Sequence, residues 1–304
     1  MSDKIFKSGF IGLIGRTNVG KSTLINKILN KNVVITSGKA QTTRNRINCI
    51  LNADNAQAIF VDCPGFFKPR NLLGEKLNNI IYGVLNDADI IVVMIDLAGG
   101  IGTGDYYVFD KIKNRSQPKF LLLNKIDLIK GKEKGGIEQE VKELQKEFDF
   151  FNCVIPISAK KGNNVDAFLK ILIEKLPEGP KFFPDGTITD MPLNKMIAEI
   201  IREKLINNLF EELPHSINVE VENMTQKTSK SGEPLISLEC CIYTEKKSQK
   251  AIIIGKSGEM LKKIGILARE ELEQLLESKV YLQIWVKVME NWTKNDSYLS
   301  RFGY

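Results

Sequence analysis

The stretch Gly15-Arg16-Thr17-Asn18-Val19-Gly20-Lys21-Ser22 decides how the rest of the chain is interpreted. An apolar run at residues 10–14 precedes it, and residues 23–29 have the apolar spacing of a helix. A strand, a loop bounded by glycines and a Lys-Ser pair that opens a helix form the context of a phosphate-binding loop. The N–H groups of such a loop and the positive end of the helix dipole point at phosphate oxygens. The alternative, a plain glycine turn, is disfavoured by the flanking elements.

Two side chains of this loop have specific expected roles. Lys21 places a positive charge on the β- and γ-phosphates, and the Ser22 hydroxyl ligates Mg²⁺. We expect the whole stretch, together with Thr23, to contact a nucleotide.

A second motif, Lys39-Ala40-Gln41-Thr42-Thr43-Arg44, lies in a polar, turn-rich region about twenty residues past the loop. A threonine at this distance can reach Mg²⁺ and the γ-phosphate only while that phosphate is present, which is how a switch loop works. Taken alone the segment is a surface loop, but after a phosphate-binding loop the switch interpretation is favoured. The sequence does not distinguish the two threonines; we favour Thr43 because it precedes Arg44.

The third motif, Asp62-Cys63-Pro64-Gly65, follows a predicted strand at residues 58–61. Asp62 can hold Mg²⁺ through water, and the Gly65 N–H can donate to the γ-phosphate. A continuous apolar run at residues 90–95 predicts a strand buried on both faces of a parallel sheet.

Two further motifs indicate which base is bound. Asn124-Lys125-Ile126-Asp127 follows the apolar run at residues 120–123. A carboxylate at position 127 accepts from both N1–H and the 2-amino group of guanine, whereas adenine offers neither donor and would leave the carboxylate unpaired. A strand at residues 153–157 ends in Ser158-Ala159-Lys160, which can touch guanine O6 through backbone N–H groups.

In this order, the five motifs resemble the translation-factor-like GTPases over residues 8 to about 176. The resemblance implies an α/β domain with a mostly parallel sheet, helices on both faces, and GTP or GDP with Mg²⁺ at the carboxyl ends of the strands. It implies Ser22, Thr43 and Asp62 as the metal site, and Lys21, Thr43 and Gly65 as the catalytic residues.

Phe66 and Phe67 stand where many GTPases have a glutamine that orients the attacking water. The chain therefore resembles the subgroup with a hydrophobic residue in that place, and we expect slow intrinsic hydrolysis that a partner or a monovalent ion accelerates. Asn18 matches the asparagine that coordinates K⁺ in related enzymes. The alternative is that Asn18 only caps the turn.

Residues 177–192 are rich in proline and glycine and predict a linker after a GTPase domain at residues 1–176. A second domain at residues 193–304, ending in a short C-terminal tail, is predicted to have α+β structure. The predicted order is helix, strand, strand, helix, helix, strand, with residues 224–234 as a hairpin loop.

Gly255-Lys256-Ser257-Gly258 joins the last two predicted helices, and a GxxG turn lets a nucleic-acid backbone approach closely. Its position in this element order resembles a prokaryotic-type KH domain, which implies a clamp for about four single-stranded nucleotides. Residues 245–263 carry a net charge of +4. The expected RNA-binding residues are the GxxG turn and three lysines around it, namely Lys246, Lys250, Gly255, Lys256, Ser257, Gly258 and Lys262.

A GTPase domain followed by a KH domain, with residues 39–44, Ile200-Ile201-Arg202-Glu203-Lys204-Leu205 and Trp285-Val286-Lys287-Val288, resembles the Era family over nearly the full length. The resemblance implies binding to the 3′ end of small-subunit (16S) ribosomal RNA, a role in assembly of the 30S subunit, a cytoplasmic location and peripheral attachment to the inner membrane. We expect a monomer. Thr17 and Cys63 depart from the family's usual proline and threonine.

Two alternatives stay open at this point. Beside an rRNA-binding GTPase, the chain could be a scaffold that binds GTP with negligible hydrolysis, or a GTPase that regulates a membrane or metabolic partner and uses the KH domain to dock protein. Composition does not separate them, because 304 residues with 43% hydrophobic content suffice for two domains of any of these kinds. The net charge of +6 is uneven, with +7 in residues 1–180 and −1 in residues 181–304. Any nucleic-acid site in the second part must therefore be a local patch.

The sequence also argues against membrane-spanning, secreted and disulfide-bonded proteins. No apolar run approaches the length of a membrane span, and the first residues lack the apolar segment of a signal peptide. The five cysteines have no CxxC spacing and are interpreted as reduced thiols in a cytosolic protein.

Overall fold

The computed structural model describes residues 5–39, 42–69, 71–129, 134–209, 216–228 and 232–304. They form two compact units. The first contains the chain up to Thr36 with Thr43–Lys68 and Leu77–Asp190, and the second contains Ser37–Thr42, Pro69–Lys76 and the chain from Met191 onward. No helix among the described residues is long and apolar enough to cross a membrane.

A six-stranded sheet in the order β2-β3-β1-β4-β5-β6 forms the centre of the first unit. All neighbouring strands are parallel except β2 and β3, which confirms the predicted mostly parallel sheet. The strands are β1 (Lys7–Gly15), β2 (Ile47–Ala53), β3 (Ala56–Asp62), β4 (Ile90–Asp96), β5 (Lys119–Asn124) and β6 (Cys153–Pro156). We did not predict β2, because its apolar residues do not alternate with polar ones.

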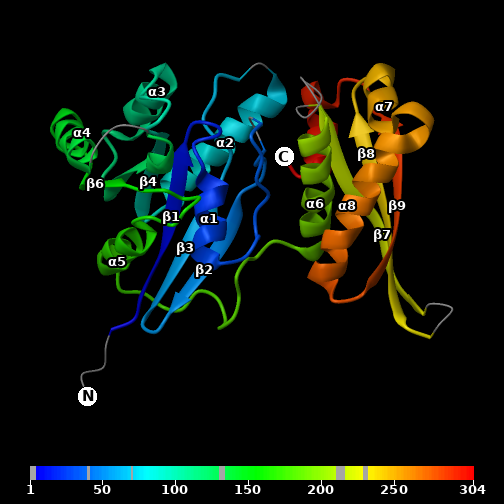
Figure 1. The fold of residues 1–304 in the computed structure, drawn as a ribbon, viewed down its shortest axis with the longest axis horizontal. Helices are drawn as coiled ribbons and strands as arrows, with labels where there is room; N and C mark the ends of the chain where they lie inside the picture. Colours follow the sequence, from blue (N-terminus) through cyan, green and yellow to red (C-terminus); the bar gives the residue numbers. More distant parts are fainter. Residues whose placement is uncertain (1–4, 40–41, 70, 130–133, 210–215, 229–231) are drawn as a thin grey trace. The chain divides into compact units, whose positions relative to one another are not determined.

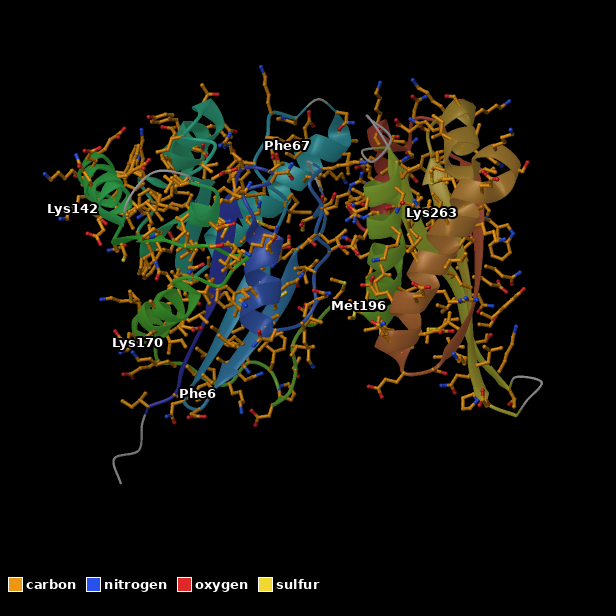
Figure 2. The ribbon with its side chains drawn as sticks, viewed as in Figure 1. Phe6, Phe67, Lys142, Lys170, Met196 and Lys263 are labelled. Carbon is orange, nitrogen blue, oxygen red and sulfur yellow. The ribbon has the colours of Figure 1, made fainter. Side chains whose placement is uncertain are left out.

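Helices flank this sheet (Figure 1). They are α1 (Lys21–Leu29), α2 (Leu72–Asp87), α3 (Thr103–Ile112), α4 (Lys134–Glu147) and α5 (Val165–Lys175). Every residue from Ile90 to Ile95 in β4 is fully buried, as a strand covered on both faces requires. The helices are amphipathic: on α4, Leu144 is buried while Lys142 is exposed on the outer surface (Figure 2).

Residues 177–190, predicted as part of a linker, pair with the first sheet instead. The Ile50 N–H donates to the Ile188 carbonyl at 2.9 Å, and Cys49 and Thr189 form an antiparallel bridge. The prolines and glycines indicated a loop correctly, but the sequence gives no sign that its backbone satisfies the outer edge of β2. The first compact unit therefore extends to residue 190.

The second unit has the predicted order of elements. They are α6 (Leu193–Asn208), β7 (Ile217–Thr228), β8 (Pro234–Thr244), α7 (Lys247–Ile254), α8 (Glu259–Leu276) and β9 (Lys279–Val288). The sheet order is β7-β8-β9, with β7 antiparallel and β9 parallel to β8. Apolar residues of α6, α8 and the three strands share one core cluster.

The predicted hairpin loop at residues 224–234 is shorter in the structure. Strand β7 continues to Thr228 and pairs with β8 from Pro234 onward, after a register shift between Val221 and Asn223. Past that shift the side chains of β7 are mostly exposed, so the strand lacks the alternation that would have revealed it.

The C-terminal tail is also structured, because it contains helix α9 (Asp296–Phe302). Trp292 is fully buried and donates from Nε1 to the Ser216 carbonyl at 3.0 Å. The Phe302 ring packs on Tyr243 of β8, so the tail covers part of the sheet.

Candidate nucleotide-binding and RNA-binding sites

The predicted phosphate-binding loop joins the end of β1 to the start of α1. Lys21 is the first residue of α1 and is buried, with Nζ donating to the Arg16 carbonyl at 3.1 Å. Burial lowers the pKa of the Lys21 ammonium, and the negative charge of the Asp62 carboxylate acts in the opposite direction. The phosphates of a nucleotide would add negative charge beside Lys21 and favour its protonated form.

Three oxygen-bearing side chains meet beside Lys21. The Ser22 hydroxyl donates to Asp62 Oδ2 at 2.9 Å and lies 3.2 Å from Thr43 Oγ1, which is 3.3 Å from the same carboxylate oxygen. Thr42 differs, because its hydroxyl donates to the Lys39 carbonyl at 2.8 Å.

The chemistry of this cluster fits a magnesium ion. Two hydroxyls and a carboxylate are hard oxygen ligands of the kind that Mg²⁺ prefers. The second carboxylate oxygen, Asp62 Oδ1, is buried with no hydrogen-bond partner among the described residues. Burial raises the pKa of the Asp62 carboxyl, although Lys21, Ser22 and Thr43 oppose the shift. A cation beside Oδ1 would satisfy both the orphaned oxygen and the buried charge.

Asn124 links three of the predicted motifs. Its Nδ2 donates to the Val19 carbonyl at 2.7 Å, and its Oδ1 accepts from the Ala159 N–H at 2.9 Å. The Ser158 hydroxyl donates to Asp127 Oδ1 at 2.6 Å, which holds the carboxylate in place. These contacts bring the phosphate loop and both predicted base-recognition motifs together at the carboxyl ends of β1, β5 and β6.

The segment after Asp62 packs closely on the phosphate loop. A Cβ on Gly65 would lie 2.6 Å from the Thr17 backbone nitrogen, so only glycine fits there. The Phe66 N–H donates to the Gly15 carbonyl at 3.0 Å. Its side chain is buried against the rings of Tyr82 and Tyr107, with both centroids 5.9 Å away. Phe66 therefore points into the core and not toward a phosphate.

The remaining predicted residues take varied positions. Asn18 is exposed and has a left-handed backbone with φ 64°. Cys63 is buried, and its thiol lies 3.5 Å from the Leu13 carbonyl oxygen. Pro64 is buried after β3, Gly20 lies in the phosphate loop, Thr17 and Thr23 are half-buried, and Lys160 is exposed.

Three polar residues that support this site were not predicted. Asp105, which is 1% exposed, accepts from Arg16 Nε at 2.8 Å and so holds the phosphate loop to the start of α3. Asp96 pairs with Lys125 at 2.6 Å. Asn78 of α2 donates to the Phe67 carbonyl at 3.0 Å. None of these belongs to a short motif, and only the fold brings them to the site.

The GxxG turn in the second unit depends on its glycines. Gly255 has φ 73°, and a Cβ there would lie 2.7 Å from Met260 Cβ. Ser257 and Gly258 also have left-handed φ angles of 51° and 83°. The turn is thus a tight, exposed corner between α7 and α8.

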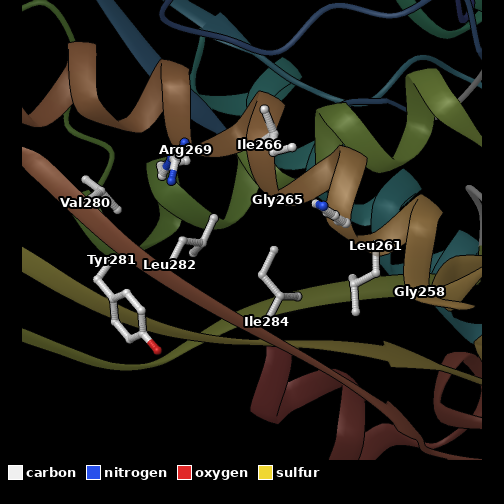
Figure 3. Close-up of a pocket in the computed structure, with 10 residues that line it drawn as sticks. Gly258, Leu261, Gly265, Ile266, Arg269, Val280, Tyr281, Leu282 and Ile284 are labelled. Carbon is white, nitrogen blue, oxygen red and sulfur yellow. The ribbon is translucent and has the colours of Figure 1, made fainter.

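A groove of about 450 Å³ runs from this turn along α8 and β9 (Figure 3). Of the predicted RNA-binding residues, only Gly258 and Lys262 line it. The others do not line it: Gly255, Lys256 and Ser257 lie in the turn at its end, Lys246 lies before α7, and Lys250 lies on α7. The unpredicted lining residues are mostly apolar and are Leu261, Gly265, Ile266, Arg269, Val280, Tyr281, Leu282 and Ile284. Their spacing along one face of α8 and along β9 could have revealed them once the turn was identified.

The groove has cations at its rim. Lys256 and Lys262 are exposed at the GxxG end, and Arg269 is exposed farther along α8. Within the part of the chain that the structure describes, none of the three forms an ion pair. An apolar floor with cations along its edge suits bases on the floor and phosphates at the rim.

Comparison with known proteins gives matches for both units. The model of a family described as 50S ribosome-binding GTPase matches residues 10–125, and the KH domain model matches residues 212–293. A solved structure of Era in complex with MgGDPNP and nucleotides 1506–1542 of 16S ribosomal RNA is 38% identical, with a TM-score of 0.93. The match covers 98% of this chain and 99% of that one. A point variant of Aquifex aeolicus Era bound to GDP·AlF₄⁻ is similar to the same extent.

Proposed function

The chain belongs to the Era family, and from that premise we propose that it is a GTP-hydrolysing switch whose KH groove binds ribosomal RNA. It converts GTP to GDP and phosphate. It binds the 3′ end of small-subunit ribosomal RNA and assists assembly of that subunit. The observation that supports this most directly is that one chain carries both a guanine-nucleotide site linked through Asn124 and a groove at a GxxG turn.

At the nucleotide site, Asp127 recognises guanine and Lys21 neutralises the phosphates. Ser22, Thr43 and Asp62 would hold Mg²⁺, which when bound supplies positive charge to the phosphate oxygens. Thr43 is favoured over Thr42 because its hydroxyl already lies with Ser22 and Asp62.

Residue 66 does not orient the attacking water, because the Phe66 side chain is buried between two tyrosines. Intrinsic hydrolysis is therefore slow. K⁺ held at Asn18, which is exposed in the phosphate loop, would supply positive charge to the transferred phosphate and so accelerate hydrolysis. A steady-state GTPase assay in K⁺ and in Na⁺ tests this assignment, and equal rates would remove it.

Thr43 and the segment after Asp62 would contact bound GTP and its Mg²⁺, and these contacts would order both parts of the chain and favour RNA binding. Hydrolysis removes the γ-phosphate, so these segments lose their ordered conformation and the RNA is released. Coupling of this kind is reciprocal, so RNA must change the affinity for nucleotide by the same factor. Titrating RNA in GTP analogue and in GDP, and then each nucleotide with and without RNA, checks both halves of the cycle.

The central experiment measures binding of an RNA with the sequence of nucleotides 1506–1542, used because Era was solved with it. The test variant is Lys256→Ala with Lys262→Ala, since a Gly255 variant would also clash with Met260. The control is Lys142→Ala with Lys146→Ala, which removes the same charge from exposed positions on α4. We expect a loss on the order of tenfold in the test variant alone.

Other outcomes identify the competing functions. If the wild-type chain binds this RNA no better than an unrelated single strand, the KH unit docks protein and the chain regulates a different partner. If a single turnover releases no phosphate, the chain is a GTP-binding scaffold and not an enzyme.

The remaining parts of the proposal concern the cell. We assign the 30S subunit as the assembled partner, a monomeric state, and a cytoplasmic location with peripheral attachment to the inner membrane. Sedimentation with 30S particles and flotation with inner-membrane vesicles test the two associations separately.

A further inference from the structure

Gly265 occupies an unusual position in the second unit. It is the seventh residue of α8, an 18-residue helix, and glycine inside a helix is less stable than alanine because it loses more backbone freedom on folding. Its backbone is ordinary right-handed helix, since it is not among the residues with positive φ. The conformation of the chain therefore does not require glycine here.

Packing within the protein does not require glycine either. A Cβ on Gly265 would meet only one atom within 4 Å, Ile284 Cδ1 at 4.0 Å. Gly255 is the opposite case, since a Cβ there would clash with Met260 at 2.7 Å. The protein itself could hold alanine at position 265.

The open space at Gly265 lies in the groove. Gly265 sits between the GxxG end and the Arg269 end, with Ile284 of β9 opposite (Figure 3). On either side the floor is made of larger apolar side chains, including Leu261, Ile266 and Leu282. The bare backbone of α8 is thus exposed to the groove where the floor is otherwise covered by side chains.

We propose that Gly265 is the seat of a nucleobase, which lies against the bare turn of α8 with its edge beside Ile284. This inference rests on the proposed RNA-binding function and deepens it. A planar ring gains contact area from a flat backbone surface, whereas a side chain at position 265 would occupy its place. The phosphates on either side of this base lie toward Lys262 and Arg269.

A nucleobase fits this place better than an apolar side chain of a protein partner. The exposed cations Lys262 and Arg269 line the groove, and the exposed Lys256 lies in the GxxG turn at its end. A partner with one negative charge in each repeating unit can pair with these cations, and single-stranded RNA has one phosphate per nucleotide.

A single substitution, Gly265→Ala, should raise the stability of the protein and lower its affinity for RNA. Gly265→Ala should raise the melting temperature of the RNA-free protein by about 2–4 °C, because it removes the helix penalty without a clash. The same change should weaken RNA binding on the order of tenfold, since a methyl group displaces the base. Gly265→Leu fills more of the groove and should weaken binding further while the protein stays folded.

Gly83 provides the matched control. It also lies inside a helix, α2, and a Cβ there would meet nothing within 4 Å. Gly83→Ala should therefore stabilise the protein to the same extent and leave RNA affinity unchanged. Equal GTP affinity in all variants would show that the first unit is intact.

RNAs that lack one base at a time identify the base in question. We expect one abasic position to weaken binding by the wild-type chain and to have no further effect on Gly265→Leu, because the side chain has already displaced that base. If every abasic position weakens both proteins equally, or if Gly265→Ala binds RNA as well as wild type, the inference is wrong while the proposed function stands. If the wild-type chain does not bind the RNA, the proposed function itself fails.

Discussion

At the nucleotide site, several polar groups are buried and hydrogen-bonded to one another, and they hold the exposed Asp127 in place, whereas in the KH groove the charged groups are exposed and separate. Asn124, Ser158 and Asp62 are at most 3% exposed, and each is hydrogen-bonded to another residue of the site. Lys256 in the GxxG turn and Lys262 on α8 are both exposed to solvent. Buried networks act as units, so removing one member disturbs the others, while exposed charges contribute small and independent amounts. The two sites should therefore respond differently to substitution.

The largest expected effect is at the base-recognition end. Asp127→Asn should weaken GTP binding about a thousandfold, because an amide cannot accept from both guanine donors and leaves one of them unpaired. It should bind xanthosine triphosphate better than the wild-type chain does, since the amide N–H can donate to the 2-carbonyl of xanthine. Competition of the two nucleotides against a fluorescent analogue measures both effects.

Ser158→Ala is the matched control for this prediction. It removes the hydroxyl that holds Asp127 but leaves the carboxylate, so it should weaken GTP binding without changing the preferred base. A loss below tenfold in Asp127→Asn would mean that this end of the site is as tolerant as the groove, and the contrast would disappear.

The next effect concerns Phe66 and combines stability with rate. Phe66→Gln should lower the free energy of unfolding by about 3 kcal/mol, because it removes a buried ring and places an amide between Tyr82 and Tyr107. It should not raise the rate of hydrolysis, since the side chain points into the core. Urea unfolding and single-turnover assays on the same preparation test both parts; faster hydrolysis would show that residue 66 can reach the attacking water.

A smaller effect follows from the raised pKa of Asp62. The folded chain binds this proton more readily than the unfolded chain, so the metal-free protein loses stability as pH rises from the ordinary carboxyl range through the raised pKa. Mg²⁺ binds the ionised form, so below the raised pKa its apparent affinity should fall by up to about tenfold for each unit of pH. Mg²⁺ titrations of the GDP-bound protein between about pH 8 and about pH 5 measure this.

Asp62→Asn separates this effect from other titrating groups. Whatever pH dependence remains in that variant belongs to the nucleotide or to other residues. If the Mg²⁺ affinity of the variant depends on pH as that of the wild-type chain does, protons and Mg²⁺ do not compete for Asp62.

The smallest effect is at the groove rim. Lys256→Ala should weaken RNA binding only a few-fold and reduce the slope of log affinity against log salt by about 0.7, the value for one phosphate of a single strand. The loss should add to that of Lys262→Ala. A strongly non-additive pair would show that the rim, like the nucleotide site, is a coupled network.

More of the nucleotide site than of the groove could be predicted from the sequence, because motifs are local and tertiary packing is not. Short motifs encode local geometry, and four of the predicted motifs, at residues 15–22, 62–65, 124–127 and 158–160, lie at the carboxyl ends of β1, β3, β5 and β6. Asp105, Asp96 and Asn78 support those motifs from distant elements, so no local pattern reveals them. In the second unit, the GxxG turn is local and was found, but the groove depends on how α8 packs beside β9.

Two predicted features changed because backbone pairing has little sequence signature. Strand β7 extends beyond the predicted hairpin boundary with exposed polar residues, and β2 has no clean alternation. The predicted linker has the composition of a loop, yet its backbone N–H and C=O groups complete the edge of the first sheet. Propensity describes side chains, whereas these elements are fixed by main-chain hydrogen bonds.

The pairing of residues 187–190 with β2 determines where a stable fragment of the GTPase unit can end. Strand β2 is at the margin of its sheet, and residues 187–190 occupy the hydrogen-bonding groups that would otherwise face outward. An uncovered margin of this kind recruits strands from other molecules and leads to aggregation. A fragment that stops at residue 176 should therefore precipitate or self-associate, while one that stops at residue 190 should remain dispersed.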